Sequence, residues 1–179
     1  MKRHLAWPLF VLVALSILAL PGKATAGEHH LGLGINFWKS VDSIAKDGFP
    51  DVEDSGVSWI LSYLYDMEGP FKVELDLEYF REGFGGATEP AFAPQALVLF
   101  GGDLYGGVGI GITLSESFDN NYSSPYFLAK VGFDWTVLPR ISIDTNLNWR
   151  ADAFNELDNF SSSAVTLAVI ARYRFKSKE

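Results

Sequence analysis

A strict two-residue alternation of apolar and charged side chains runs through residues 71–79, which read Phe-Lys-Val-Glu-Leu-Asp-Leu-Glu-Tyr. Successive side chains of a β-strand point to opposite faces, so one face of this stretch is apolar and the other is charged. A helix would mix the two kinds of side chain around its surface. The stretch is therefore predicted to be a β-strand that separates two very different environments.

Seven further stretches share this alternation to a lesser degree. They are residues 31–41, 57–67, 95–102, 104–115, 126–137, 141–151 and 164–175. Three connections between the eight stretches are short and rich in turn-forming residues, at 68–70, 102–103 and 138–140. The other four connections are longer and polar, at 42–56, 81–94, 116–125 and 152–163. Short turns that alternate with long loops are typical of an up-and-down barrel with both termini at one end.

The first 26 residues have the layout of a secretion signal. Lys2 and Arg3 precede an apolar run that Pro8 interrupts, and residues 24–26 (Ala-Thr-Ala) match a small-x-small cleavage site. The run is shorter than the roughly 20 apolar residues that span a bilayer as a helix. We expect three segments: a signal peptide at 1–26, cleaved near Ala26, a β-barrel at 27–175 and a short periplasmic tail at 176–179.

Alternation alone does not distinguish a membrane barrel from a soluble, lipocalin-like barrel whose apolar face points inward. Side-chain volume does, because eight strands enclose only enough space for their own inward side chains. The apolar faces carry many aromatic residues and would overfill that space, whereas the opposite faces are rich in Gly, Ser, Thr, Ala and Asn. The sequence predicts an all-β, eight-stranded antiparallel transmembrane barrel with a packed polar interior. Leu75, Ile110 and Phe133 are expected to face lipid.

Aromatic residues on the apolar faces also gather toward the two ends of the predicted strands. The group near the long connections is Phe37, Trp59, Tyr79, Phe127 and Trp149. The group near the short turns is Tyr65, Phe71, Phe100, Trp135, Tyr173 and Phe175. Two such bands are expected at the two interfaces of a membrane.

The chain resembles the small eight-stranded bacterial outer-membrane proteins of the OmpA and OmpX type over essentially all of residues 27–175. The last predicted strand carries the sharpest local likeness, because residues 169–175 read Val-Ile-Ala-Arg-Tyr-Arg-Phe. Tyr173 and Phe175 look like the terminal signal that such barrels present to the barrel assembly machinery, although four residues follow Phe175 here. The resemblance implies an outer-membrane location after export through the periplasm, and contact with membrane lipid and lipopolysaccharide.

Acidic and basic residues on the predicted inner faces nearly balance. We expect them to form a salt-bridge network that fills the lumen, since an unpaired buried charge costs several kcal/mol. A narrow ion path lined by Glu74, Asp76 and Glu78 is the alternative. The expected lumen network comprises Lys72, Glu74, Asp76, Glu78, Lys130, Asp134, Asp144, Arg150, Arg172 and Arg174, and Asp66 lies on the same face.

The long connections are strongly acidic, and the net charge of −8 argues against a nucleic-acid partner. Asp47, Asp51, Glu53 and Asp54 are candidates for binding divalent cations, although their spacing does not fit an EF-hand calcium loop. The chain has no cysteine, which excludes thiolate metal sites. The adjacent His29 and His30 are predicted to belong to a solvated leader. No metal site or cofactor is otherwise expected.

No catalytic residues are predicted. Glu74 and Glu78 would need a substrate cleft to act as an acid and a base, and a filled lumen offers none. A lipid A deacylase built on this fold would need a His and a Ser on the outer wall, and residues 148–151 (Asn-Trp-Arg-Ala) do not match that pattern. The sequence therefore favours a non-enzymatic barrel with a structural or surface-interaction role. A narrow channel for ions or very small solutes is the second choice, and a lipid A-modifying enzyme and a soluble binding protein follow it.

Overall fold

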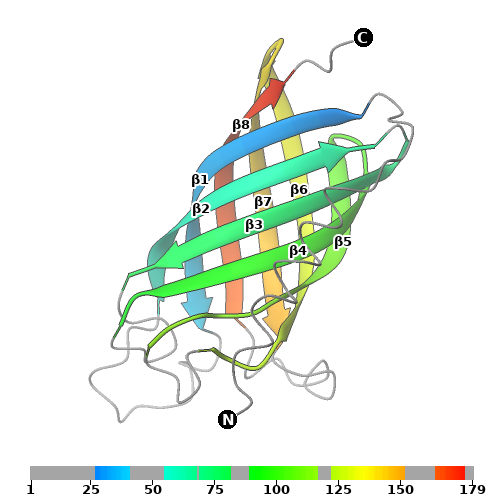
Figure 1. Cartoon of the computed structure of the whole chain (residues 1–179). Helices are drawn as coiled ribbons and strands as arrows, with labels where there is room; N and C mark the ends of the chain where they lie inside the picture. The colour runs from blue at the N-terminus through cyan, green and yellow to red at the C-terminus, as the bar shows by residue number, and fades with distance from the viewer. Residues whose placement is uncertain are drawn as a thin grey trace, which may run out of the picture.

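The computed structural model describes residues 27–40, 55–67, 69–81, 89–116, 122–151 and 164–175. Eight antiparallel strands pair in sequence order, and β8 pairs with β1 to close a barrel (Figure 1). The strands are β1 (Glu28–Ser40), β2 (Ser55–Asp66), β3 (Phe71–Phe80), β4 (Ala91–Gly101), β5 (Leu104–Gly111), β6 (Tyr126–Leu138), β7 (Ile141–Ala151) and β8 (Ala164–Phe175). The predicted fold class is confirmed.

The register of the strands sets their tilt relative to the barrel axis. A row of directly paired residues that begins at His29 returns to the same strand at Lys39, ten residues further on (29 to 39). Between them the row passes through Tyr65, Val73, Val98, Val108, Ala129, Trp149 and Val165. With about 3.3 Å per residue and about 4.8 Å between strands, this stagger tilts the strands by about 40° from the barrel axis. A row of paired residues therefore rises from the short-turn end toward the long-loop end as it passes from β1 through β2 to β8.

Three strands, β1, β2 and β4, begin earlier than the sequence predicts. β1 starts at Glu28, so the prediction that His29 and His30 form a solvated leader is wrong. His30 pairs with Leu64 of β2 and with Arg174 of β8, and its side chain is buried on the inner face. β4 starts at Ala91 and continues through Pro94, which the sequence assigned to the preceding loop.

β5 ends earlier than predicted, at Gly111. Beyond it, Leu114 forms isolated bridges with Phe92 on one side and Tyr122 on the other. The pairing of β4, β5 and the chain before β6 therefore extends past the regular end of β5. At the opposite end of the barrel, the turn after β4 uses Gly101 at φ +132°, a conformation that residues with a side chain rarely adopt.

The outer wall is apolar. Ile110 is 54% exposed and Phe133 is 39% exposed, while Leu75 lies half-buried on the same face as the exposed Leu77. All three residues expected to face lipid therefore point away from the lumen. Within the described residues, no helix is long and apolar enough to cross a membrane.

Aromatic rings pack in pairs near both ends of the wall. At the short-turn end, the ring centroids of Phe71 and Phe100 lie 5.4 Å apart, and those of Tyr173 and Phe175 lie 5.2 Å apart. At the long-loop end, the rings of Tyr79 and Phe92 lie 5.0 Å apart. These pairs occupy the two predicted bands.

The lumen also contains apolar side chains, which pack beside the polar ones. An apolar cluster inside the barrel consists of Leu64, Leu97, Leu99, Tyr105, Tyr126 and Leu128. Leu97 and Leu99 fit because the facing β5 positions are glycines: a Cβ on Gly109 would lie 2.6 Å from Leu97 Cγ, and one on Gly107 would lie 2.5 Å from Leu99 Cδ2. The glycines of β5 therefore provide the volume that the leucines of β4 fill.

Candidate functional site

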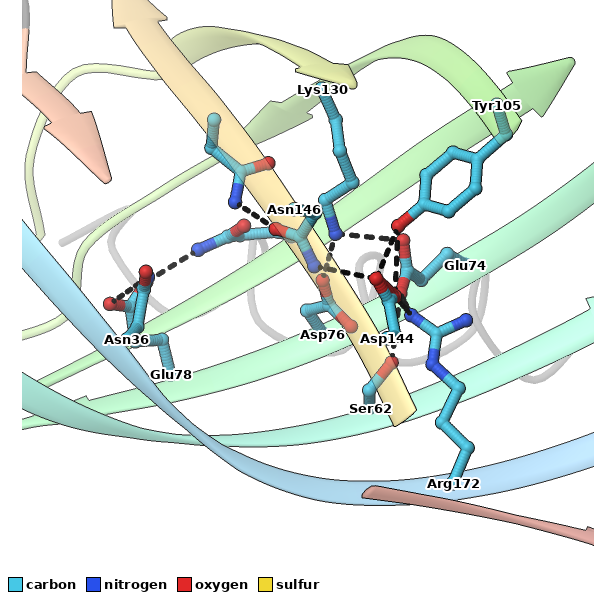
Figure 2. A network of polar contacts seen from close by, with 12 residues as sticks. Asn36, Ser62, Glu74, Asp76, Glu78, Tyr105, Lys130, Asp144, Asn146 and Arg172 are labelled. Atoms are coloured by element: carbon cyan, nitrogen blue, oxygen red, sulfur yellow. Dashed lines mark hydrogen bonds and ion pairs between the residues drawn. The ribbon is translucent and has the colours of Figure 1, made fainter. Parts of the chain in front are cut away.

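The middle of the lumen holds a network of buried ion pairs (Figure 2). Lys130 Nζ of β6 donates to Glu74 Oε2 of β3 at 2.7 Å and to Asp76 Oδ2 at 2.9 Å. The guanidinium of Arg172 on β8 pairs with both Glu74 and Asp144. Strand alternation turns all five side chains inward. Each cation thus contacts two carboxylates, so neither buried positive charge lacks a counter-charge.

Neutral side chains complete the hydrogen bonding of the carboxylates in this network, which we call the middle layer. Tyr105 Oη lies 2.9 and 2.8 Å from the two carboxylate oxygens of Asp144 and donates to them, and Ser62 Oγ donates to Glu74 Oε1 at 2.9 Å. Asn146 Nδ2 donates to Asp144 Oδ1 at 3.2 Å. Glu74 therefore accepts from Lys130, Arg172 and Ser62 together, and it is fully buried.

A second layer lies closer to the long-loop end and centres on Glu78. Its carboxylate pairs with Arg150 of β7 and accepts from Asn36 Nδ2 at 2.8 Å and Gln95 Nε2 at 2.9 Å. The side chain of Ser58 also donates to it. The Arg150 guanidinium lies 5.5 Å from the ring centroid of Phe80 and 5.4 Å from that of Tyr126, which is within cation–π range. Two aromatic rings thus hold the arginine that spans the lumen at this level.

The remaining predicted lumen charges lie near the short-turn end. Lys72 Nζ donates to the carbonyl of Gly102 at 2.9 Å and lies 3.4 Å from Asp66 Oδ2. Arg174 is about one-third exposed and pairs with Glu28 Oε2 at 2.9 Å, away from the middle layer. Asp134 faces Asp144 across the β6–β7 ladder. Among the described residues, no ion pair joins Asp134 to the network.

Sequence reasoning missed the neutral members of the network. Tyr105 lies two and four residues before Gly107 and Gly109, so all three lie on one face of β5. Its inward direction was therefore predictable from the alternation. Its bond to Asp144, 39 positions away, was not readable, because it depends on the stagger of the strands. The sequence indicated only the inward direction of the other neutral members, and not their hydrogen-bond partners. These members are Asn36, Ser58, Ser62 and Gln95.

Potential metal ligands do not gather among the described residues. Among them, no group of three or more His, Asp or Glu side chains is arranged to hold a metal ion. His29 Nδ1 lies on the outer wall, 2.7 Å from Tyr63 Oη, and His30 Nε2 lies 3.8 Å from Glu28 Oε2. The candidate cation ligands Asp47, Asp51, Glu53 and Asp54 lie outside the described residues.

No protein-family model and no curated protein matches the chain. Several solved structures are similar to it. Neisserial surface protein A is 12% identical with a TM-score of 0.53, over 82% of this chain and 97% of that one. The outer membrane protein OprG of Pseudomonas aeruginosa is 14% identical with a TM-score of 0.50, over 84% and 96%. A de novo designed transmembrane β-barrel is 13% identical with a TM-score of 0.50, over 86% and 100%. At these identities the likeness shows the fold, and it agrees with the resemblance that the sequence indicated.

Proposed function

We propose that this closed eight-stranded barrel is a non-enzymatic bacterial outer-membrane protein with a plugged lumen, and that its role is structural or lies in surface interaction. Contacts that cross the lumen support the plugged state. Glu78 of β3 pairs with Arg150 of β7, and these strands are four apart in a ring of eight, so the pair spans the full width of the barrel. A continuous water path would have to break such pairs.

The outer wall of such a barrel faces lipid, so a surface role would belong to the long connections. Their acidic sequences support contact with cationic partners or with divalent cations that bridge to lipopolysaccharide phosphates. The acidic group in the connection between β1 and β2 (Asp47, Asp51, Glu53 and Asp54) is the first candidate. Calcium titration of the refolded protein by calorimetry tests it, with the four residues changed to Asn or Gln as the control. Absence of binding heat at millimolar calcium in both proteins would remove this part of the proposal.

Planar-bilayer recording tests the plugged lumen. We expect the refolded protein to insert without stepwise conductance. Glu78→Gln and Glu116→Gln are a matched pair of charge-removing variants, because Glu78 is buried in the lumen and Glu116 is exposed beyond β5. A wild-type conductance that Glu78→Gln alters and Glu116→Gln does not would replace the plugged barrel by a narrow channel.

Two further measurements test the membrane and non-enzymatic parts of the proposal. Insertion into lipid vesicles with heat-modifiable gel migration is expected of a transmembrane barrel, whereas a soluble binding protein would remain outside the vesicles. Incubation with radiolabelled lipid A is expected to leave its acyl chains intact. Release of a fatty acid in that assay would make the protein an enzyme.

A further inference from the structure

Polar groups interrupt the apolar outer wall at the short-turn end, near the seam between β1 and β8. Arg140, in the turn between β6 and β7, is exposed, and its Nη1 donates to Tyr173 Oη at 3.4 Å. Tyr173 is 42% exposed on the outer face of β8. On the other side of the seam, His29 Nδ1 and Tyr63 Oη share a hydrogen bond of 2.7 Å. The register places Tyr63, Leu31 and Tyr173 in one row, so the two polar pairs flank Leu31.

Arg140 differs from the other arginine at this end of the barrel. The guanidinium of Arg174 is occupied, because it contacts Glu28 Oε2 at 2.9 Å and the carbonyl oxygen of Pro139 at 2.5 Å. Within the described part of the chain, Arg140 forms no ion pair with a carboxylate. Its planar fork of N–H groups, next to a hydroxyl, matches the oxygens of a phosphate.

The wall beyond these donors is suited to hydrocarbon. The next outward residues of β8 are Ala171 and Val169, and the register places Leu33 of β1 and Ile143 of β7 on either side of Ala171. All four side chains point outward, and none is polar. A ligand that contacts both regions must carry an anionic head and apolar tails.

We propose that Arg140 and Tyr173 bind the phosphate of an anionic glycerophospholipid, in the leaflet at the short-turn end of the barrel. The acyl chains lie along Ala171 and Val169, and the His29–Tyr63 pair provides hydrogen bonds to the headgroup across Leu31. The proposal rests on the proposed function only in requiring that the outer wall faces a membrane.

Native mass spectrometry of the full refolded protein, titrated with dioleoyl phosphatidylglycerol, tests this site. Arg140→Gln is expected to weaken lipid binding about tenfold, because a charge-assisted contact is lost. Tyr173→Phe is expected to weaken it about threefold, since one neutral hydroxyl is removed. Arg140→Lys keeps the charge but not the fork, and is expected to lie between wild type and Arg140→Gln. Heat-modifiable migration of each variant verifies that the barrel has folded.

Arg81→Gln is the matched control, because Arg81 is exposed at the other end of the wall, directly after β3. Equal lipid binding by Arg140→Gln and Arg81→Gln would overturn the proposal. Dioleoylglycerol, which lacks the phosphate, is expected not to bind measurably. Soluble glycerol 3-phosphate is expected not to compete at concentrations equal to the lipid; equal competition would assign the site to a free phosphate ester instead. A folded barrel that retains no lipid would refute this site alone, whereas a chain that does not insert into vesicles would refute the proposed function as well.

Discussion

Replacing Glu74 should damage the barrel far more than replacing Asp76, although the two carboxylates bind the same lysine. Glu74 is the partner of both Lys130 and Arg172 and also accepts from Ser62. Within the described residues, Asp76 forms an ion pair with Lys130 alone, and Lys130 keeps Glu74 as a partner when Asp76 is neutralised. The two variants to compare are Glu74→Gln and Asp76→Asn, because each removes a charge with almost no change in volume.

The expected magnitudes follow from the number of buried ion pairs that each variant breaks, because Lys130 and Arg172 each keep at least one carboxylate in either variant. A charged hydrogen bond contributes about 1.5–3 kcal/mol, and Glu74→Gln loses two of them, to Lys130 and to Arg172. Asp76→Asn removes one charged hydrogen bond, worth about 1.5–3 kcal/mol, while the cation stays paired. The middle and second layers hold four buried carboxylates (Glu74, Asp76, Glu78 and Asp144) and three cations (Lys130, Arg150 and Arg172), so either variant equalises the two counts and the variants differ only in the ion pairs that they break. We expect Glu74→Gln to lower the free energy of unfolding by at least 3 kcal/mol and Asp76→Asn by less than about 2 kcal/mol.

Urea unfolding of the barrel in lipid vesicles, followed by tryptophan fluorescence and by gel migration, measures both values by linear extrapolation. Adding Lys130→Met to each variant forms a double-mutant cycle that isolates the coupling of Lys130 to each carboxylate. A loss for Asp76→Asn that equals or exceeds that for Glu74→Gln would show that Glu74 does not organise the network.

Three further changes probe other parts of the barrel. Gly132→Ala would place a Cβ 2.5 Å from Tyr105 Oη and should cost about 1–3 kcal/mol of stability, measured in the same urea assay; no loss would mean that the interior is loosely packed there. Phe175→Ala should slow insertion catalysed by the barrel assembly machinery more than Phe71→Ala, which removes a ring of the same band; equal rates would remove Phe175 from the assembly signal. Arg150→Met should destabilise the barrel by about 3–5 kcal/mol by leaving the Glu78 carboxylate without its cation, and a stability equal to wild type would show that this pair is dispensable.

Alternation along a strand predicts which charged side chains share one face. Glu74, Asp76 and Glu78 alternate with apolar residues on one strand, so their common direction follows from the period alone. The choice of lipid on the apolar face followed from side-chain volume, and the outward positions of Ile110 and Phe133 agree with it.

The partners of those charges were not predictable from the sequence. Arg150 meets Glu78 at a separation of 72 residues, and which residue of β7 lies level with Glu78 depends on the stagger accumulated around the barrel. Leu97 and Leu99 were visible as apolar residues on an inward face, but only the facing glycines of β5 explain how the lumen accommodates them. The strand positions of His29 and His30 were missed because the ladder continues beyond the alternating part of β1.

Because the rows of paired residues rise along the barrel axis, the long-loop end of the barrel is not level. One outward row runs from Trp59 through Tyr79, Phe92 and Leu114 to Tyr122, by pairing and by the isolated bridges. At a strand tilt of about 40°, each step rises by roughly 3 Å, so Tyr122 stands about 12 Å further along the barrel axis than Trp59. If Trp59 lies at the membrane surface, Phe92, Leu114 and Tyr122 rise above it, so this side of the described barrel presents apolar and aromatic side chains to the space outside the membrane.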